Sequence, residues 1–180
     1  KMAVKMPDAI STERDDINEN EWTSIQNEIH TALEKIELYR LEEGKVLEAD
    51  FLSRIATISN LLEQVLEIDP ERITNVRERL HKGVADLKEK YDENRFEQEL
   101  VYYIEKFDIS EEKVRLATHL DYFIEILEEG NGKKLNFMAQ EIGREINTIG
   151  SKANDSTIQR LVVNMKDELE KIKEQTANVL

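Results

Sequence analysis

Apolar residues recur at alternating steps of three and four through most of this chain of 180 residues, and this spacing constrains its fold more than any other feature. One run extends from Trp22 to Tyr39, and a second extends from Leu47 to Val65. Shorter runs fill residues 73–87, 116–127, 135–149 and 158–172. Such spacing places apolar side chains on one stripe of an α-helix. Because no segment of any length shows the alternation of a β-strand, the sequence predicts an all-α fold.

The composition favours long helices that pack as a bundle or a coiled coil. The chain has 6 glycines and 2 prolines, and 36% of its residues are charged. It has no cysteine, which excludes disulfides, thiolate zinc sites and cysteine nucleophiles. No apolar run approaches the ~20 residues that span a bilayer, and no secretory signal pattern is present. We therefore expect a cytoplasmic protein without a membrane partner.

The sequence also predicts where the helices begin and end. Asp69 can cap a helix and Pro70 suits the first helical position, so a boundary is expected there. Residues 21–92 are accordingly predicted to form a long antiparallel helical hairpin. Residues 1–20 are predicted to be an extended lead-in, and residues 93–180 to be a C-terminal helical bundle. Within this bundle we expect Ser110 to cap one helix and Gly150 to end another.

One segment, Gly132–Leu161, differs from the rest in charge. The whole chain has a formal net charge of -14, which argues against coating of duplex nucleic acid by bulk positive charge. This segment is instead locally cationic: it carries Lys133, Lys134, Arg144, Lys152 and Arg160 against Glu141, Glu145 and Asp155. Lysines beside helix N-termini can bind phosphate. Solubilising loop charge is an equally good explanation of Lys133, Lys134 and Lys152.

A pair of carboxylates in this segment is a candidate metal site. Glu141 and Glu145 are four residues apart and therefore share a helix face, with Arg144 beside them and Asn147 near the same edge. Two such carboxylates can bind one Mg²⁺ or Mn²⁺ ion, because both metals prefer oxygen ligands. An ordinary solvated face is the commoner explanation of two glutamates at this spacing.

The preceding helix offers a second candidate face. Glu112, Arg115 and His119 lie on it by the same spacing, and His119 is interpreted as a metal ligand, a general acid or a packed structural residue. Glu97 and Glu99 join the same polar cleft if their helix packs beside the other two. The sequence contains no ExxH di-iron signature, P-loop, GxGxxG or GxSxG motif, which excludes the corresponding enzyme classes.

At this point the residues resemble a known family. The stretches Asn94–Leu127 and Gly132–Leu180, with the specific motif QEIGREINTIGSKAND, closely resemble the C-terminal domain of the YicC family. VKMPDAIS and VRERLHKGVADL resemble the middle of such chains. The resemblance implies a bacterial, cytoplasmic, divalent-metal-dependent endoribonuclease that is linked to RNA turnover and stress and forms ring-like oligomers. Family members carry a further N-terminal domain, so the resemblance also implies that this chain is a truncated fragment.

The resemblance raises the expectation that these candidate residues act together on single-stranded RNA. The expected catalytic residues are His119, Glu141 and Glu145, and the expected ligands of Mn²⁺ or Mg²⁺ are Glu99, Glu112, Glu141 and Glu145. The expected RNA-binding residues are Arg115, Lys133, Lys134, Arg144, Asn147 and Lys152. Gly143 departs from the family pattern, which more often has Asn there. A homo-oligomer, a ring-like hexamer, is expected. The alternative is a non-catalytic module that oligomerises or binds RNA and positions a catalytic N-terminal domain.

Overall fold

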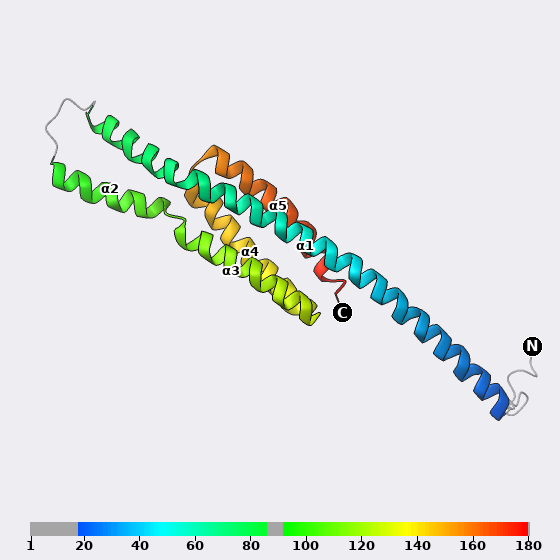
Figure 1. The fold of residues 1–180 in the computed structure, drawn as a ribbon. Coiled ribbons are helices and arrows are strands. Elements are labelled where there is room, and N and C mark those ends of the chain that lie inside the picture. Colours follow the sequence, from blue (N-terminus) through cyan, green and yellow to red (C-terminus); the bar gives the residue numbers. More distant parts are fainter. Residues whose placement is uncertain (1–17, 86–91, 180) are drawn as a thin grey trace, which may run out of the picture. The chain divides into compact units, whose positions relative to one another are not determined.

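The computed structural model describes residues 18–85 and 92–179, and it confirms the all-α prediction. Its helices are α1 (Glu19–Ala85), α2 (Glu93–Phe107), α3 (Ser110–Glu129), α4 (Gly132–Ala153) and α5 (Ser156–Thr176) (Figure 1). No strand occurs in either described range. The predicted lead-in falls almost entirely before residue 18, and the predicted helix end near residue 91 also lies outside the described residues.

The predicted helical hairpin over residues 21–92 was wrong, because α1 is a single continuous helix over most of this range. This helix is 67 residues long and continues through Pro70, so Asp69 and Pro70 are not a helix boundary. Proline lacks the N–H that would bond the carbonyl four residues earlier, which normally weakens a helix interior. Tertiary contacts on both sides of Pro70 oppose this cost, because Val65 and Val76 are buried. The side chain of Asp69 contacts Arg72 and Lys113 instead of capping a helix.

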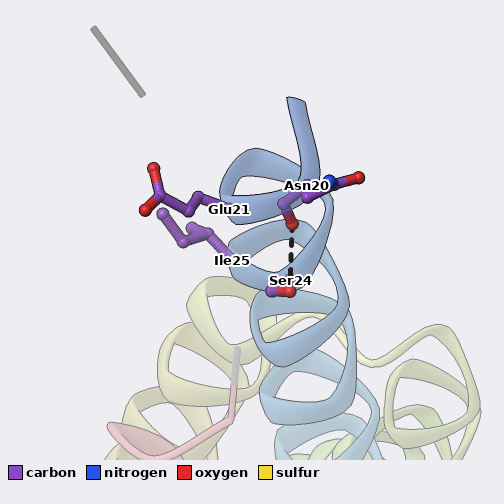
Figure 2. A pocket seen from close by; sticks show the side chains of 4 residues that line it. All are labelled: Asn20, Glu21, Ser24 and Ile25. Carbon is purple, nitrogen blue, oxygen red and sulfur yellow. Dashed lines mark hydrogen bonds between the residues drawn. The ribbon is translucent and has the colours of Figure 1, made fainter. Parts of the chain in front are cut away.

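The chain divides into two units, one ending at Glu43 and one beginning at Gly44. The described part of the first unit is almost entirely the N-terminal portion of α1, and large apolar side chains are exposed along it. We call the residues at the seam positions Trp22, Ile25, Ile29, Ala32, Ile36 and Tyr39 the α1 stripe. Ile25 borders a shallow pocket that is also lined by Asn20, Glu21 and Ser24 (Figure 2). The Ser24 hydroxyl donates to the Asn20 carbonyl at 3.0 Å, so its polar group is already satisfied within the helix.

The second unit has a continuous apolar core made by α1, α3, α4 and α5. Phe51 of α1 meets Phe123 of α3 edge-on, with ring centroids 5.8 Å apart. Further fully buried side chains are Ile58, Leu116, Leu135, Ile142, Ile146, Ile149 and Ile158. Each such side chain contributes about 1.5–3 kcal/mol when it leaves water, so this core is the main source of stability. Helix α2 contacts α1 through the rings of His81 and Phe96, 5.1 Å apart.

Short turns fix the order of the helices around the core. Between α3 and α4, Gly130 adopts the left-handed conformation with φ 66°, and Asn131 caps α4 by accepting from the Lys134 amide at 3.1 Å. Between α4 and α5, Asn154 is left-handed and Asp155 caps α5. The prediction that Ser110 caps α3 was wrong. Ser110 is instead the first residue of α3, and its amide donates to the Asp108 carboxylate.

The prediction that Gly150 ends a helix was also wrong, because Gly150 lies inside α4. A Cβ added there would lie 3.0 Å from Cγ1 of Val162 on α5. The glycine therefore permits close packing of α4 on α5 and does not end a helix.

Candidate functional site

Two ion pairs define how α3 and α4 lie against each other. The Lys134 ammonium is 2.6 Å from Glu129 at the end where the two helices connect. At the other end, the Lys152 ammonium is 2.6 Å from Glu112. Residue numbers rise along α3 from Glu112 to Glu129 and along α4 from Lys134 to Lys152, so the helices are antiparallel.

This register brings several predicted site residues to the same place. His119 follows Glu112 by seven positions and Glu145 precedes Lys152 by seven, so the two lie at the same level on facing helices. Arg115 is one turn from His119, and Glu141 is one turn from Glu145. We call the surface formed by Arg115, His119, Glu141, Arg144 and Glu145 the α3–α4 face. It is assembled from two segments that the sequence singled out separately.

Carboxylates already neutralise most of the predicted RNA-binding cations. Arg144 Nη1 lies 2.8 Å from Glu141, and Arg115 Nη2 lies 2.5 Å from Glu111. Lys134 and Lys152 are paired as described above, and the hydrogen bond from Lys134 to Glu129 raises the pKa of that lysine. The Arg115–Glu111 pair is exposed on both sides, and such a pair contributes only about 0.2–1 kcal/mol. A phosphate group can therefore replace Glu111 beside Arg115 at little cost.

Two carboxylates of the site differ from surface charges because they are buried. Glu112 is 5% exposed and Glu145 is 8% exposed. Lys152 neutralises Oε1 of Glu112, whereas its Oε2 is buried and has no hydrogen-bond partner among the described residues. Burying a carboxylate costs free energy unless it is paired. Lys152 offsets part of this cost for Glu112.

The predicted metal ligands do not gather into one group. Within residues 18–85 and 92–179, no set of three or more acidic or histidine side chains is close enough together to hold a metal ion. Glu99 is exposed on α2, and Glu112 is bound to Lys152. Glu97 points toward α1, where its carboxylate is 3.8 Å from His81 Nε2. Glu141 and Glu145 therefore remain as a two-carboxylate pair.

Three other residues lie away from this pair. Asn147 is two positions beyond Glu145 and three beyond Arg144, so it is exposed on the Arg144 side of α4, away from Glu145. Lys133 is exposed in the first turn of α4. Gly143 faces α5, since a Cβ there would lie 3.2 Å from Leu169 Cδ2. The departure of Gly143 from the family pattern therefore affects helix packing and not the α3–α4 face.

A buried charge network that the sequence did not predict lies beside the site. Arg72 of α1 is 4% exposed, and its Nη2 lies 2.6 Å from Asp69. It also donates to the Phe107 carbonyl at 2.9 Å and to the Ala153 carbonyl at 2.8 Å. Asp69 receives a second cation, Lys113 of α3, at 2.5 Å. The available signal was spacing, because Asp69 and Arg72 continue the apolar seam between Val65 and Val76.

The turn between α2 and α3 adds a further acidic group to this network. The Asp108 carboxylate accepts from the Ser110 amide at 2.9 Å. Hydrogen bonds from the Ser110 hydroxyl and amide lower the pKa of Asp108, and the charges of Lys113 and Lys152 lower it further. Asp108 is therefore held as a carboxylate near the paired end of α3 and α4.

Comparisons with known proteins show the family to which the chain belongs. The family model "Endoribonuclease YicC-like, C-terminal" matches residues 65–180. A protein named "Probable endoribonuclease YicC" from Clostridioides difficile is 35% identical over 182 residues, which covers 98% of this chain and 62% of the relative. One of the same name from Haemophilus influenzae is 33% identical over 142 residues, 78% of this chain and 50% of the relative. The chain thus spans about half to three fifths of these relatives. None of the described helices has the length and apolar character of a membrane span.

Proposed function

The chain belongs to the YicC-like endoribonuclease family, and we propose that it hydrolyses phosphodiester bonds of single-stranded RNA at the α3–α4 face. The observation that carries this proposal is the shared level of His119 and buried Glu145 on two facing helices, inside the segment that matches the family. A cytoplasmic location and a role in RNA turnover belong to the same proposal.

The side chains of the face suit separate parts of this reaction. Arg115 and Arg144 are exposed guanidinium groups, which bind phosphate oxygens through two parallel hydrogen bonds. The imidazole of His119 can donate or accept a proton near neutral pH. Glu145, which lies at the same level on the facing helix, can orient a water molecule. Lys133 and Lys134 extend the cationic surface along the first turn of α4.

A divalent cation, Mn²⁺ or Mg²⁺, is part of the proposal. Glu141 and Glu145 would hold it as a two-carboxylate pair, with water and RNA phosphate as the remaining ligands, an arrangement that Mg²⁺ commonly adopts. When bound, the ion neutralises phosphate charge and lowers the pKa of bound water. We expect EDTA to stop cleavage and Mn²⁺ or Mg²⁺ to restore it. Cleavage that is unchanged in EDTA would remove the metal from the mechanism.

The carboxylate pair is tested by replacing Glu141 and Glu145 together with Gln. We expect cleavage of a labelled, unstructured RNA to fall by 100-fold or more, because both charges of the pair are lost (a loss of roughly 3 kcal/mol in transition-state stabilisation). The matched control is Glu170→Gln on α5, an exposed glutamate that pairs with Lys173 at 2.8 Å. Circular dichroism checks the fold of both variants. Full activity of the double variant would exclude this pair.

A second candidate function has its own observation, the α1 stripe. An exposed row of apolar residues at heptad-like spacing is typical of a helix that packs on partner helices. In this alternative the chain is an assembly module that forms a homo-oligomer, a ring-like hexamer by the family resemblance, and positions a catalytic domain of a longer protein. Incubating labelled RNA with this chain and with a full-length relative separates the candidates. Cleavage by this chain supports the nuclease, and cleavage by the longer protein alone supports the module.

A further inference from the structure

Two exposed aromatic rings border the α3–α4 face. Tyr122 follows His119 by three positions on α3, and Phe137 precedes Glu141 by four on α4, so both share the side of their helix that carries the face. Tyr122 is 43% exposed and Phe137 is 59% exposed. The adjacent Phe123 is fully buried against Phe51, so the core does not require the ring of Tyr122.

The same register sets the order of groups along the face. Tyr122 lies at the level of Glu141, and Phe137 lies one further turn toward the connection between α3 and α4. Lys134 comes next, three positions before Phe137 on α4, and the hydrogen bond from its ammonium to Glu129 raises its pKa. From one end to the other, the face thus presents a lysine, two aromatic rings, and then the carboxylates, His119 and arginines of the site.

Charge alone gives this face little affinity for RNA. Four of the predicted RNA-binding cations already have carboxylate partners, and the whole chain has a net charge of -14. Exchange of an exposed ion pair changes affinity by about fivefold at most. Stacking of one base on an aromatic side chain changes affinity by about 5- to 150-fold. The aromatic rings are therefore the larger source of binding energy available on this surface.

We propose that Tyr122 and Phe137 stack on unpaired nucleobases of the RNA whose phosphate is bound by the adjacent arginines. This inference rests on the proposed nuclease function and specifies its substrate. Bases inside a duplex are stacked on each other, whereas unpaired bases can turn outward onto an aromatic ring. The two rings therefore select single-stranded segments, and they do so without reading base edges. Tyr122 and Phe137 bind substrate and take no part in proton transfer.

The test measures binding separately from cleavage. Tyr122→Ala and Phe137→Ala are made in the Glu141→Gln, Glu145→Gln background, and binding of a labelled 12-nucleotide unstructured RNA is followed by fluorescence anisotropy. We expect each substitution to weaken binding by about 5- to 150-fold, the range that corresponds to one lost stacking contact. Tyr122→Phe keeps the ring and is expected to bind within about twofold of the background protein. Tyr102→Ala, which removes an exposed tyrosine of α2, is the matched control and is expected to change nothing.

A second substrate distinguishes stacking from other causes. In RNA of the same length with abasic sugars at consecutive positions, the effect of Tyr122→Ala and Phe137→Ala is expected to disappear, because no base is present to stack. Equal losses on both RNAs, or no loss on either, would overturn the proposal. Tyr122→Leu and Phe137→Leu keep apolar volume without the ring and replace the alanine variants if those fail to fold.

The remaining outcomes separate this inference from the function on which it rests. If the unsubstituted chain cleaves no RNA but the alanine variants lose binding only on RNA with bases, the nuclease proposal fails and the stacking sites stand. If the chain cleaves RNA and the variants bind normally, the reverse holds. A change in sedimentation coefficient on Tyr122→Ala or Phe137→Ala would assign the rings to contact with a second copy and overturn the proposal.

Discussion

At the scale of the residue, Arg72 makes the most demanding set of contacts in the molecule. Its guanidinium is buried with Asp69 and donates to carbonyl groups at the end of α2 and the end of α4. We expect Arg72→Met to reduce the free energy of unfolding by about 3–5 kcal/mol, because Asp69 loses a partner in a buried site and two carbonyls lose donors. Urea denaturation measures the change. Arg77→Met, at an exposed arginine of the same helix, is expected to stay within about 0.5 kcal/mol, and an equally small effect at Arg72 would contradict the network's role.

Asp108 gives this network a pH dependence with a definite sign. Its pKa is lowered from the ordinary value of 3.8 in the folded chain, so the folded state favours the carboxylate. The resulting stability is present above pH 3.8 and is lost as the pH falls through the lower, folded-state pKa. We expect Asp108→Asn to be less stable than the unsubstituted chain at pH 7, and the difference to shrink as the pH falls below about 3.8. Thermal unfolding across pH 2–7 checks this, and a difference that grew in acid would refute it.

These residues also mark what sequence could predict about the site. The i to i+4 spacing was enough to place Glu141 with Glu145 and Arg115 with His119, because a helix repeats regularly. It could not show that Glu112 holds Lys152 or that Asp69 holds Arg72 and Lys113, because those contacts depend on how separate helices pack. Nor could spacing distinguish Glu145, which is buried, from Glu141, which is partly exposed.

At the scale of the element, replacing a glycine inside a helix by alanine is expected to change stability in opposite directions at Gly150 and Gly44. Gly150→Ala would place a Cβ 3.0 Å from the stiff Val162 side chain, and we expect a net loss of about 1 kcal/mol despite the better helix propensity of alanine. Gly44 has no neighbouring atom within 4 Å of an added Cβ, so Gly44→Ala is expected to gain about 0.5–1 kcal/mol. Thermal unfolding of both variants makes the comparison. A stabilising Gly150→Ala would show that α4 and α5 can separate without cost.

The helices themselves were the most predictable level of the fold. The apolar spacing gave α3, α4 and α5 close to their observed bounds, because one buried stripe dictates where each helix packs. At Pro70 and Gly150, local preference indicated a boundary and tertiary packing overrode it, and at Ser110 the predicted cap was the first residue of the helix. Val65, Asp69, Arg72 and Val76 all lie on the buried side of α1, so ending the helix at Pro70 would remove half of that seam from the core.

At the scale of the whole molecule, the α1 stripe predicts self-association. Ile25, Ile29 and Ile36 are 41%, 51% and 54% exposed. We expect a double Trp22→Glu, Ile29→Glu variant to sediment as a 21.0 kDa monomer, while the unsubstituted chain sediments as an oligomer. Leu41→Glu changes an equally exposed residue off the stripe and is expected to leave the oligomer intact. If the unsubstituted chain is itself a monomer, the assembly alternative loses its support.

The contacts of Arg72 also have a consequence for synthesis of the protein. Its carbonyl partners lie 35 and 81 residues further along the chain, at Phe107 and Ala153. Before Ala153 has left the ribosome, the Arg72 guanidinium therefore lacks one of the carbonyl partners that it has in the folded protein. Because α1 is translated before α3 and α4, its apolar side remains exposed until those helices have been translated. We therefore expect the interval before α4 emerges to be the period in which the nascent chain is most prone to aggregation.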